Sequence, residues 1–416
     1  MGNTAGSFDF ASLAQDDKCS ARDEVGAVRI LVAPDKFKGA LNAREVAENI
    51  AKGLRDVLPD AEIEIVPMAD GGEGTAEAIC EARSGSWLKC KAHDPIGREI
   101  EARYAWIEDG ELAVMEMSEA AGMRRLSENE RDPVRATTFG VGEMILDAKN
   151  RDANEIIIGL GGSATNDGGW GLARALGYRF YSDARELKKD VSELRNLTRI
   201  TFPEKVVGAL VPSAQPKDRR LTQPPLQRTL PTIIAAVDVR NPLLGDSGAT
   251  QVFGPQKGAS HDELKVLEQA LTRLANVVAE DFGFDYRDKP GAGAAGGLGF
   301  GLMSFCGATI RPGFDVVAEA VGLESKMKDA DVVITGEGSL DRQTLEGKTP
   351  AGVARLARKL GKKVFAIVGR NKGDRQVDEL FDEVYELARP DMSETEQMKL
   401  AGELLREKAR ELARSL

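Results

Sequence analysis

The chain has 416 residues, 42% of them hydrophobic and 30% charged, and this length and composition predict two or three globular domains rather than one small binding module. The formal net charge of -11 disfavours a dedicated nucleic-acid-binding protein, because such a protein needs a basic surface to displace the counterions of phosphates. No apolar run reaches the roughly 18 residues of a membrane span, and the N-terminus lacks a signal-peptide pattern. We therefore expect no nucleic-acid or membrane partner.

Cysteine and histidine usage narrows the chemistry. The four cysteines form no CxxC pair and are too sparse to crosslink a chain of this length, which indicates a reducing, cytoplasmic compartment. The two histidines, His93 and His261, are far apart in the sequence. This disfavours a histidine-rich zinc site and a Ser-His-Asp triad. A divalent metal ion should therefore bind carboxylates.

The N-terminal part of the chain predicts alternating strands and helices. Residues 1–27 lack apolar periodicity and predict a disordered extension. Residues 28–33 predict a buried strand, and residues 62–66 predict a second one. Between them, Asn42 and Glu45 form a capping-box pattern that starts a helix. This order of strand, loop and helix is typical of α/β folds.

The middle of the chain has a different pattern. Alternating strands between Trp87 and Met117 indicate entry into a second domain, in which residues 155–158 and 232–237 predict buried strands. Prolines gather between these two strands, so we expect an exposed loop over residues 210–231.

Units of strand and helix return in the last third, where strands at 331–335 and 363–369 flank a helix over about 350–360. Because both ends of the chain share this order, we predict two α/β domains, the first discontinuous, with a parallel sheet of flavodoxin or Rossmann type, and the second inserted into it. The predicted boundaries are 28–92 and 290–416 for the first domain and 93–289 for the second.

A glycine-rich loop over residues 159–169 follows a predicted strand and precedes a helical stretch. Free backbone N–H groups in such a setting face an anion. The loop also matches GxGxxA, which leaves a nicotinamide-dependent oxidoreductase acting on a hydroxy acid as an alternative. The residues 166–169 delay the helix that a dinucleotide fingerprint requires, so we disfavour that alternative.

Charged side chains cluster at loop ends, where α/β folds place their ligands. Several loop acids together can bind Mg²⁺ through one or two carboxylates and orient a hydroxyl for attack, although any single one is typical of an N-cap. Loop lysines supply the charge that phosphate chemistry needs. The acids are Asp35, Asp70, Glu73, Asp167, Asp238, Glu337 and Asp341, and the lysines are Lys36, Lys38, Lys257 and Lys348.

Six segments in order resemble the signature blocks of the two-domain bacterial glycerate kinases; they are residues 33–41, 68–75, 158–169, 238–243, 252–259 and 334–341. The resemblance runs from about residue 28 to 369. It implies transfer of the γ-phosphate of ATP to D-glycerate, usually at the 2-hydroxyl, with Mg²⁺, in a cleft between two α/β domains. Transfer to the 3-hydroxyl and a non-catalytic sugar-acid sensor stay open as alternatives. Lys36 departs from the family, which often has a small hydroxyl residue there.

Chemical reasoning on these blocks assigns roles that phosphoryl transfer requires. Catalytic roles go to Lys38, Asp70 and Asp167, and metal binding goes to Asp238, Glu337 and Asp341. The residues expected to bind substrate or nucleotide are Asp35, Gly71, Gly72, Glu73, Gly159, Gly161, Gly162, Ser163, Thr165, Asn166, Asn241, Gln256, Lys257, Gly336 and Lys348. The expected small-molecule partners are D-glycerate and ATP, and a homodimer is a possible assembly.

Overall fold

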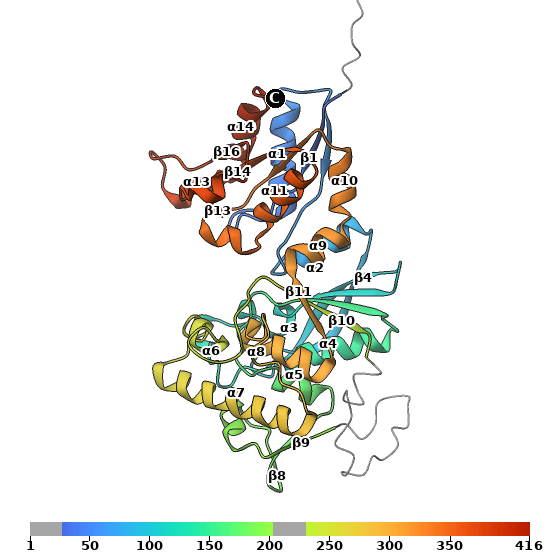
Figure 1. The fold of residues 1–416 in the computed structure, drawn as a ribbon, viewed down its shortest axis with the longest axis vertical. Helices are drawn as coiled ribbons and strands as arrows, with labels where there is room; N and C mark the ends of the chain where they lie inside the picture. The colour runs from blue at the N-terminus through green and yellow to red at the C-terminus, as the bar shows by residue number, and fades with distance from the viewer. Residues whose placement is uncertain (1–26, 203–229) are drawn as a thin grey trace, which may run out of the picture.

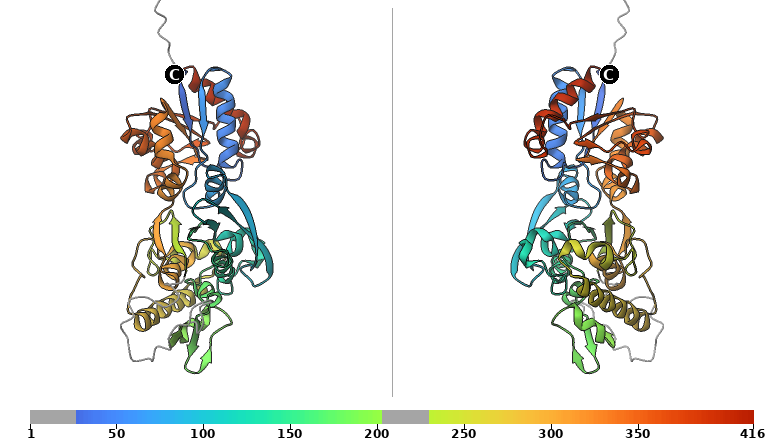
Figure 2. Two further views of the ribbon diagram at one scale, coloured as in Figure 1. Left: turned by 90° about the vertical axis from the view of Figure 1, so that its right-hand side faces the viewer. Right: turned by 90° about the vertical axis from the view of Figure 1, so that its left-hand side faces the viewer.

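The computed structural model describes residues 27–202 and 230–416. The predicted extension over 1–27 and most of the predicted loop over 210–231 lie outside the described residues. Two lobes stack along the long axis of the molecule, each built around its own sheet, as Figures 1 and 2 show from three sides. The mixed α/β architecture confirms the predicted fold class.

The first lobe is built on a five-stranded parallel sheet whose strands come from both ends of the chain. Aliphatic runs bury the central strands on both faces, as expected of a parallel sheet covered by helices. In spatial order the strands are β16 (Glu383–Glu386), β14 (Lys363–Val368), β12 (Val332–Thr335), β1 (Arg29–Val32) and β2 (Glu62–Ile65).

The helices of the first lobe cover both faces of that sheet. The predicted capping box of Asn42 and Glu45 is present at the start of the first of them, which confirms that prediction. The helices are α1 (Ala43–Arg55), α10 (Leu323–Asp329), α11 (Thr349–Lys359), α12 (Arg375–Asp378), α13 (Glu394–Lys399) and α14 (Ala401–Ala413). Helices α1 and α14, from opposite ends of the chain, pack against each other on one face.

The second lobe is built on a six-stranded mixed sheet. Its strands, in spatial order, are β11 (Thr309–Pro312), β10 (Thr232–Val237), β6 (Glu155–Gly159), β5 (Leu112–Glu116), β4 (Glu99–Ile107) and β3 (Ser86–His93). The pairs among β11, β10, β6 and β5 are parallel, whereas β4 and β3 add antiparallel strands at the edge. Between β6 and β10 the chain forms a small antiparallel sheet. Its strands are β8 (Arg185–Glu186), β7 (Arg179–Ser182) and β9 (Arg199–Thr201).

Helices also pack around the sheet of the second lobe. They are α3 (Ser118–Ala121), α4 (Phe139–Asn150), α5 (Trp170–Ala175), α6 (Ala249–Phe253), α7 (His261–Phe282) and α8 (Ala294–Gly301). None of the helices within residues 27–202 and 230–416 combines the length and apolar character of a transmembrane span.

The boundaries of the lobes differ from the predicted ones. Strand β3 crosses the boundary predicted at 92/93, and β11 lies beyond the one predicted at 289/290, yet both belong to the second sheet. Helices α2 (Thr75–Ala82) and α9 (Gly313–Ala320) lie between the sheets and share one apolar cluster with strands of both. We therefore propose a division near residues 85 and 313. Periodicity alone gives no information about which sheet a strand joins.

Candidate active site between the two sheets

Four acids from both lobes follow strands. Asp35 follows β1, Asp70 follows β2 and Glu337 follows β12, whereas Asp238 follows β10 of the second sheet. The Asp70 carboxylate acts electrostatically on the other three and raises the pKa of each. The carboxyl ends of parallel strands in both sheets therefore build one acidic site.

The shared site makes these acids hard to ionise. Burial and the neighbouring Asp70 raise the pKa of Asp35 to about 7, although the Thr349 hydroxyl donates to its carboxylate over 2.6 Å. Burial also raises the pKa of Glu337 to about 7, against the effect of a 2.7 Å hydrogen bond from Thr344. Desolvation and Asp70 raise the pKa of Asp238 to about 6, but Asp238 is exposed, so solvent screens this effect more than at Asp35 or Glu337. Each raised pKa indicates carboxylates that a cation would stabilise.

Two lysines lie among these acids. Lys36 Nζ donates to the Glu73 carbonyl over 2.6 Å and is 3.6 Å from the Glu73 carboxylate. Its charge opposes the rise in the pKa of both Asp35 and Asp238. Lys348 acts in the same way on Asp238 and Glu337. The site thus combines acids with cations, as phosphoryl transfer requires.

The glycine-rich loop after β6, residues 159–162, contacts the loop over residues 71–74 through its backbone. A methyl group on Gly159 would lie 2.7 Å from the Gly71 carbonyl oxygen, and one on Gly161 would lie 2.5 Å from Gly72 Cα. Gly162 has a φ of 71°, in the left-handed region, and faces the Glu73 carboxylate. These glycines therefore serve close approach between the lobes, a use that a GxGxxA pattern does not distinguish from dinucleotide binding.

Asp167 lies inside the second lobe, with no exposed surface. Its carboxylate accepts hydrogen bonds from Thr138 N–H and Oγ1–H and from the N–H groups of Gly169 and Gly171. A carboxylate held in this way cannot reach a substrate hydroxyl, which does not fit the predicted catalytic role. We propose instead that Asp167 anchors the start of α5.

Three other predicted binding residues lie near Asp167. Lys257 is buried and donates to the Thr165 carbonyl over 2.7 Å, and burial lowers its pKa to about 7. Asn166 Nδ2 donates to Thr250 Oγ1 over 3.0 Å. Among the described residues, Thr165 Oγ1 and Asn166 Oδ1 have no hydrogen-bond partner. This interior is separate from the Asp70 acids, and its residues stay predicted binding residues.

The remaining predicted residues fall at different places. Asn241 Nδ2 donates to the Ser247 carbonyl, and the Gly336 carbonyl accepts from Asp35 N–H. Asp341 is 2.9 Å from Lys372 Nζ and caps the 3₁₀ turn Arg342–Glu346, so both of its local contacts are explained without a ligand. Ser163 is buried, whereas Gln256 is exposed in a 3₁₀ turn.

Two cavities approach the acidic site from different walls. A cavity of about 280 Å³ is lined by Asp35, Lys36 and Glu73 among others. A larger one, about 1930 Å³, is lined by Asp238 and Asn241 and extends along β11, α9 and α11. Asp70 acts electrostatically on one acid of each cavity, Asp35 in the smaller and Asp238 in the larger. A small and a large cavity suit an enzyme that binds one small and one large substrate at the same time.

Comparison with known proteins agrees with these features. The chain matches the model of the glycerate kinase family over residues 30–416. The chain belongs to this family. A glycerate kinase of Halalkalibacterium halodurans is 41% identical over 92% of this chain and 97% of its own. The glycerate 2-kinase of Escherichia coli K12 is 41% identical over 82% of this chain and 85% of its own.

The fold of this family member also matches a solved structure. The crystal structure of a protein described as glycerate kinase 2 from Salmonella typhimurium LT2 superposes with a TM-score of 0.78 at 39% identity, covering 94% of this chain and 98% of that one. The chain is therefore a phosphotransferase of the glycerate kinase family, as the six sequence blocks predicted.

The acids of this kinase fit a divalent cation. Mg²⁺ binds through one or two carboxylates and completes its shell with water and phosphate oxygens. Asp238 and Glu337 offer such carboxylates with raised pKa values, whereas Asp341 is already paired with Lys372. Within residues 27–202 and 230–416, no three metal-ligating side chains converge on one point. The donor set thus fits a metal ion that arrives with phosphates rather than one held by protein alone.

Sequence reasoning missed several residues of this site. Thr344 and Thr349 donate to its acids, and Glu116 accepts from the start of α2. Arg103 and Arg124 line the smaller cavity. Thr344 and Thr349 follow Glu337 closely in the chain, so a sequence motif can include them. Arg103 lies on β4 and Arg124 in the 3₁₀ turn Met123–Arg125, and no local pattern indicates that both reach this cavity.

We expect Lys36→Ala to lower kcat by about two orders of magnitude, because it removes a cation that acts on both Asp35 and Asp238. Lys38 was the predicted catalytic lysine, but the structure places it on an exposed turn. Lys38→Ala is thus a matched variant two residues away. Steady-state rates of both variants at saturating substrates decide between the lysines: a greater loss in Lys38→Ala would contradict the assignment to Lys36.

We expect Asp35→Asn to stabilise the fold at high pH. The native pKa of about 7 lies above the ordinary value of 3.8, so ionising Asp35 costs stability as the pH rises from about 4 to about 7. Asparagine stays neutral, so the gain, on the order of 1–3 kcal/mol, is complete above pH 7 and vanishes near pH 4. Thermal melting from pH 4 to 8 measures it. A constant difference across that range would contradict the prediction.

Proposed function

We propose that this kinase transfers the γ-phosphoryl group of ATP to the 2-hydroxyl of D-glycerate, giving 2-phospho-D-glycerate and ADP, with Mg²⁺, in the cytoplasm. The observation that carries the proposal is the coupling of Asp70 to carboxylates on both lobes. Phosphoryl transfer needs positioning, charge neutralisation and an oriented nucleophile, and this site supplies charges of both signs between two cavities. The name of the Escherichia coli relative supports the 2-hydroxyl as acceptor.

Carboxylates of the acidic site accept the proton in this proposal. The bond between the γ-phosphorus and the oxygen that leaves with ADP breaks, and a bond from phosphorus to the glycerate oxygen forms. The hydroxyl proton passes to Asp35 or Asp70. A pKa of about 7 suits Asp35 for this step, because a general base works best when its pKa is near the working pH.

Cationic groups balance the charge of the transferred phosphoryl group. Lys36 and Lys348 approach the acids from opposite loops of the first lobe. Asp238 and Glu337 would hold Mg²⁺, which neutralises phosphate charge when bound. The larger cavity has room for a nucleotide, and Asp238 in its wall places the phosphates toward Asp70.

Coupled ADP release with D-glycerate and MgATP tests the activity, and phosphorus NMR of the product identifies the acceptor hydroxyl. We expect ADP release that depends on both D-glycerate and Mg²⁺, and a single product signal from 2-phosphoglycerate. A signal from 3-phosphoglycerate would overturn the choice of hydroxyl only. Absence of ADP release, with binding of glycerate retained, would support a sensor instead.

A further inference from the structure

The smaller cavity contains a second group of charges, apart from the acids around Asp70. It lies between the start of α1, the start of α2 and the edge strands of the second sheet. One end reaches Asp35 and Lys36, and the other is lined by Arg103, Arg124 and Glu119. At about 280 Å³ it has room for a three-carbon acid but not for a nucleotide.

Three arginines share a single carboxylate at that end. Glu119, with 11% of its side chain exposed, is 2.7 Å from Arg124 Nη2, 3.0 Å from Arg125 Nη2 and 3.3 Å from Arg103 Nε. Arg124 Nε donates to the Ser118 carbonyl. Arg124 also acts electrostatically on Glu116 in the cavity wall. Two carboxylates therefore face three guanidinium groups, and this end of the cavity attracts a further anion.

The other acids in the cavity wall do not provide that balance. Glu116 accepts hydrogen bonds from the N–H groups of Gly74 and Ala76 at the start of α2. Glu81 is paired with Arg44, whose guanidinium also contacts Glu48. Glu77 also lines the cavity and is exposed on α2. The lining as a whole has more acids than basic residues, so the excess of positive charge is local to the arginines around Glu119.

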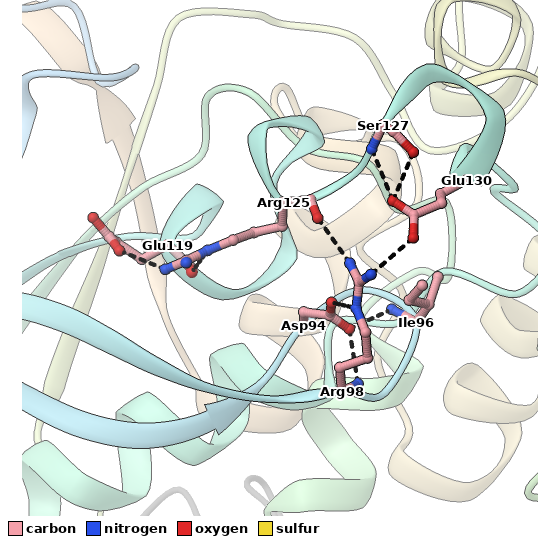
Figure 3. Close-up of polar contacts among 7 residues, drawn as sticks. All are labelled: Asp94, Ile96, Arg98, Glu119, Arg125, Ser127 and Glu130. Atoms are coloured by element: carbon pink, nitrogen blue, oxygen red, sulfur yellow. Dashed lines mark hydrogen bonds and ion pairs between the residues drawn. The ribbon is translucent and has the colours of Figure 1, made fainter.

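Contacts with the β3–β4 connection hold the segment that contains Arg125, the neighbour of Arg124, and Figure 3 shows them. Arg98 contacts Asp94, is 2.8 Å from Glu130 and donates to the Arg125 carbonyl over 2.9 Å. Ser127 and Glu130 close a capping box in the same segment. The turns that carry Arg124 are thus fixed to the β3–β4 connection, which preorganises its guanidinium.

We propose that this cavity binds the carboxylate of a small 2-hydroxy acid through Arg124, with Arg103 beside it, and directs the hydroxyl toward Asp35. The inference rests on the proposed function and deepens it, because it names the part of the site that recognises the acid. Guanidinium groups bind carboxylates through two parallel hydrogen bonds, which fixes the orientation of the acid as well as its affinity. A neutral polyol of the same size lacks this contact.

Arg124→Ala and Arg125→Ala form a matched pair for the test. Both arginines contact Glu119, but Arg124 lines the cavity and Arg125 does not. We expect Arg124→Ala to raise the KM for D-glycerate at least tenfold, with the KM for ATP changed less than twofold. Arg125→Ala should leave both within twofold, and Arg124→Lys should recover part of the affinity because it restores the charge.

Calorimetric titration of D-glycerate and of glycerol into the nucleotide-free enzyme gives a readout without turnover. The wild type should prefer D-glycerate, and Arg124→Ala should lose that preference while its melting temperature stays near that of Arg125→Ala. An unchanged KM for D-glycerate in Arg124→Ala, or equal losses in both alanine variants, would overturn the inference. A wild type that binds D-glycerate but releases no ADP would overturn the proposed function and leave the binding site standing.

Discussion

Asp70→Asn should lower kcat by about three orders of magnitude and at the same time raise the melting temperature at pH 8. Asp70 acts on Asp35, Asp238 and Glu337 together, so its removal takes away the group that couples the two lobes. The same removal relieves repulsion among carboxylates that ionise reluctantly, which stabilises the fold. Steady-state kinetics and thermal melting of one preparation measure both effects.

The rate loss in Asp70→Asn has a matched control in Asp331→Asn. Asp331 pairs with Arg29 on the surface, 3.7 Å away, and its loss should leave kcat unchanged. Repulsion by Asp70 also contributes to the raised pKa of Asp35, so the acid limb of the pH–rate profile should move to lower pH in any residual activity. A wild-type rate in Asp70→Asn would rule out the acidic site as the catalytic one.

Gly161→Ala should lower kcat by about two orders of magnitude and destabilise the protein by about 1–3 kcal/mol, as overpacking does. The new methyl group would lie 2.5 Å from Gly72 Cα, where both contacting groups are backbone and neither can rotate away. The two loops must then separate, and with them the acids that each lobe contributes. Kinetics and chemical denaturation measure these effects.

Gly402→Ala is the corresponding control. Gly402 lies in α14, where a methyl group would meet only the side chain of Asn49, at 3.3 Å. This variant should keep the wild-type rate, and its stability should change little or rise, because alanine favours a helix. If Gly161→Ala retained full activity, the contact between the glycine-rich loops would be irrelevant to catalysis.

Local patterns in the sequence predict that three of the acids lie together. Asp35, Asp70 and Glu337 follow parallel strands, and parallel strands bring their carboxyl ends to one edge, so local patterns suffice to place them together. The approach of Asp238 from the other sheet depends on how the lobes pack, and the family resemblance supplied that prediction where local patterns could not.

Other residues show why local patterns fail. Asp167 lies in a glycine-rich loop like a substrate-binding acid, yet its carboxylate accepts only from groups inside the lobe. An acid that faces backbone N–H groups and one that faces a ligand have the same sequence context. Arg124 illustrates the converse, since its position against α1 depends on contacts between residues far apart in the chain.

The split origin of the first sheet has a consequence for synthesis of the protein. Strands β1 and β2 emerge from the ribosome early, but the partner of β1 on its other side, β12, ends at Thr335, and the edge strand β16 ends at Glu386. The second sheet is complete once β11 has been made, at Pro312. The lobe with the N-terminal strands therefore folds last, and β1 must stay unpaired on one side, protected from aggregation, until about four fifths of the chain exists.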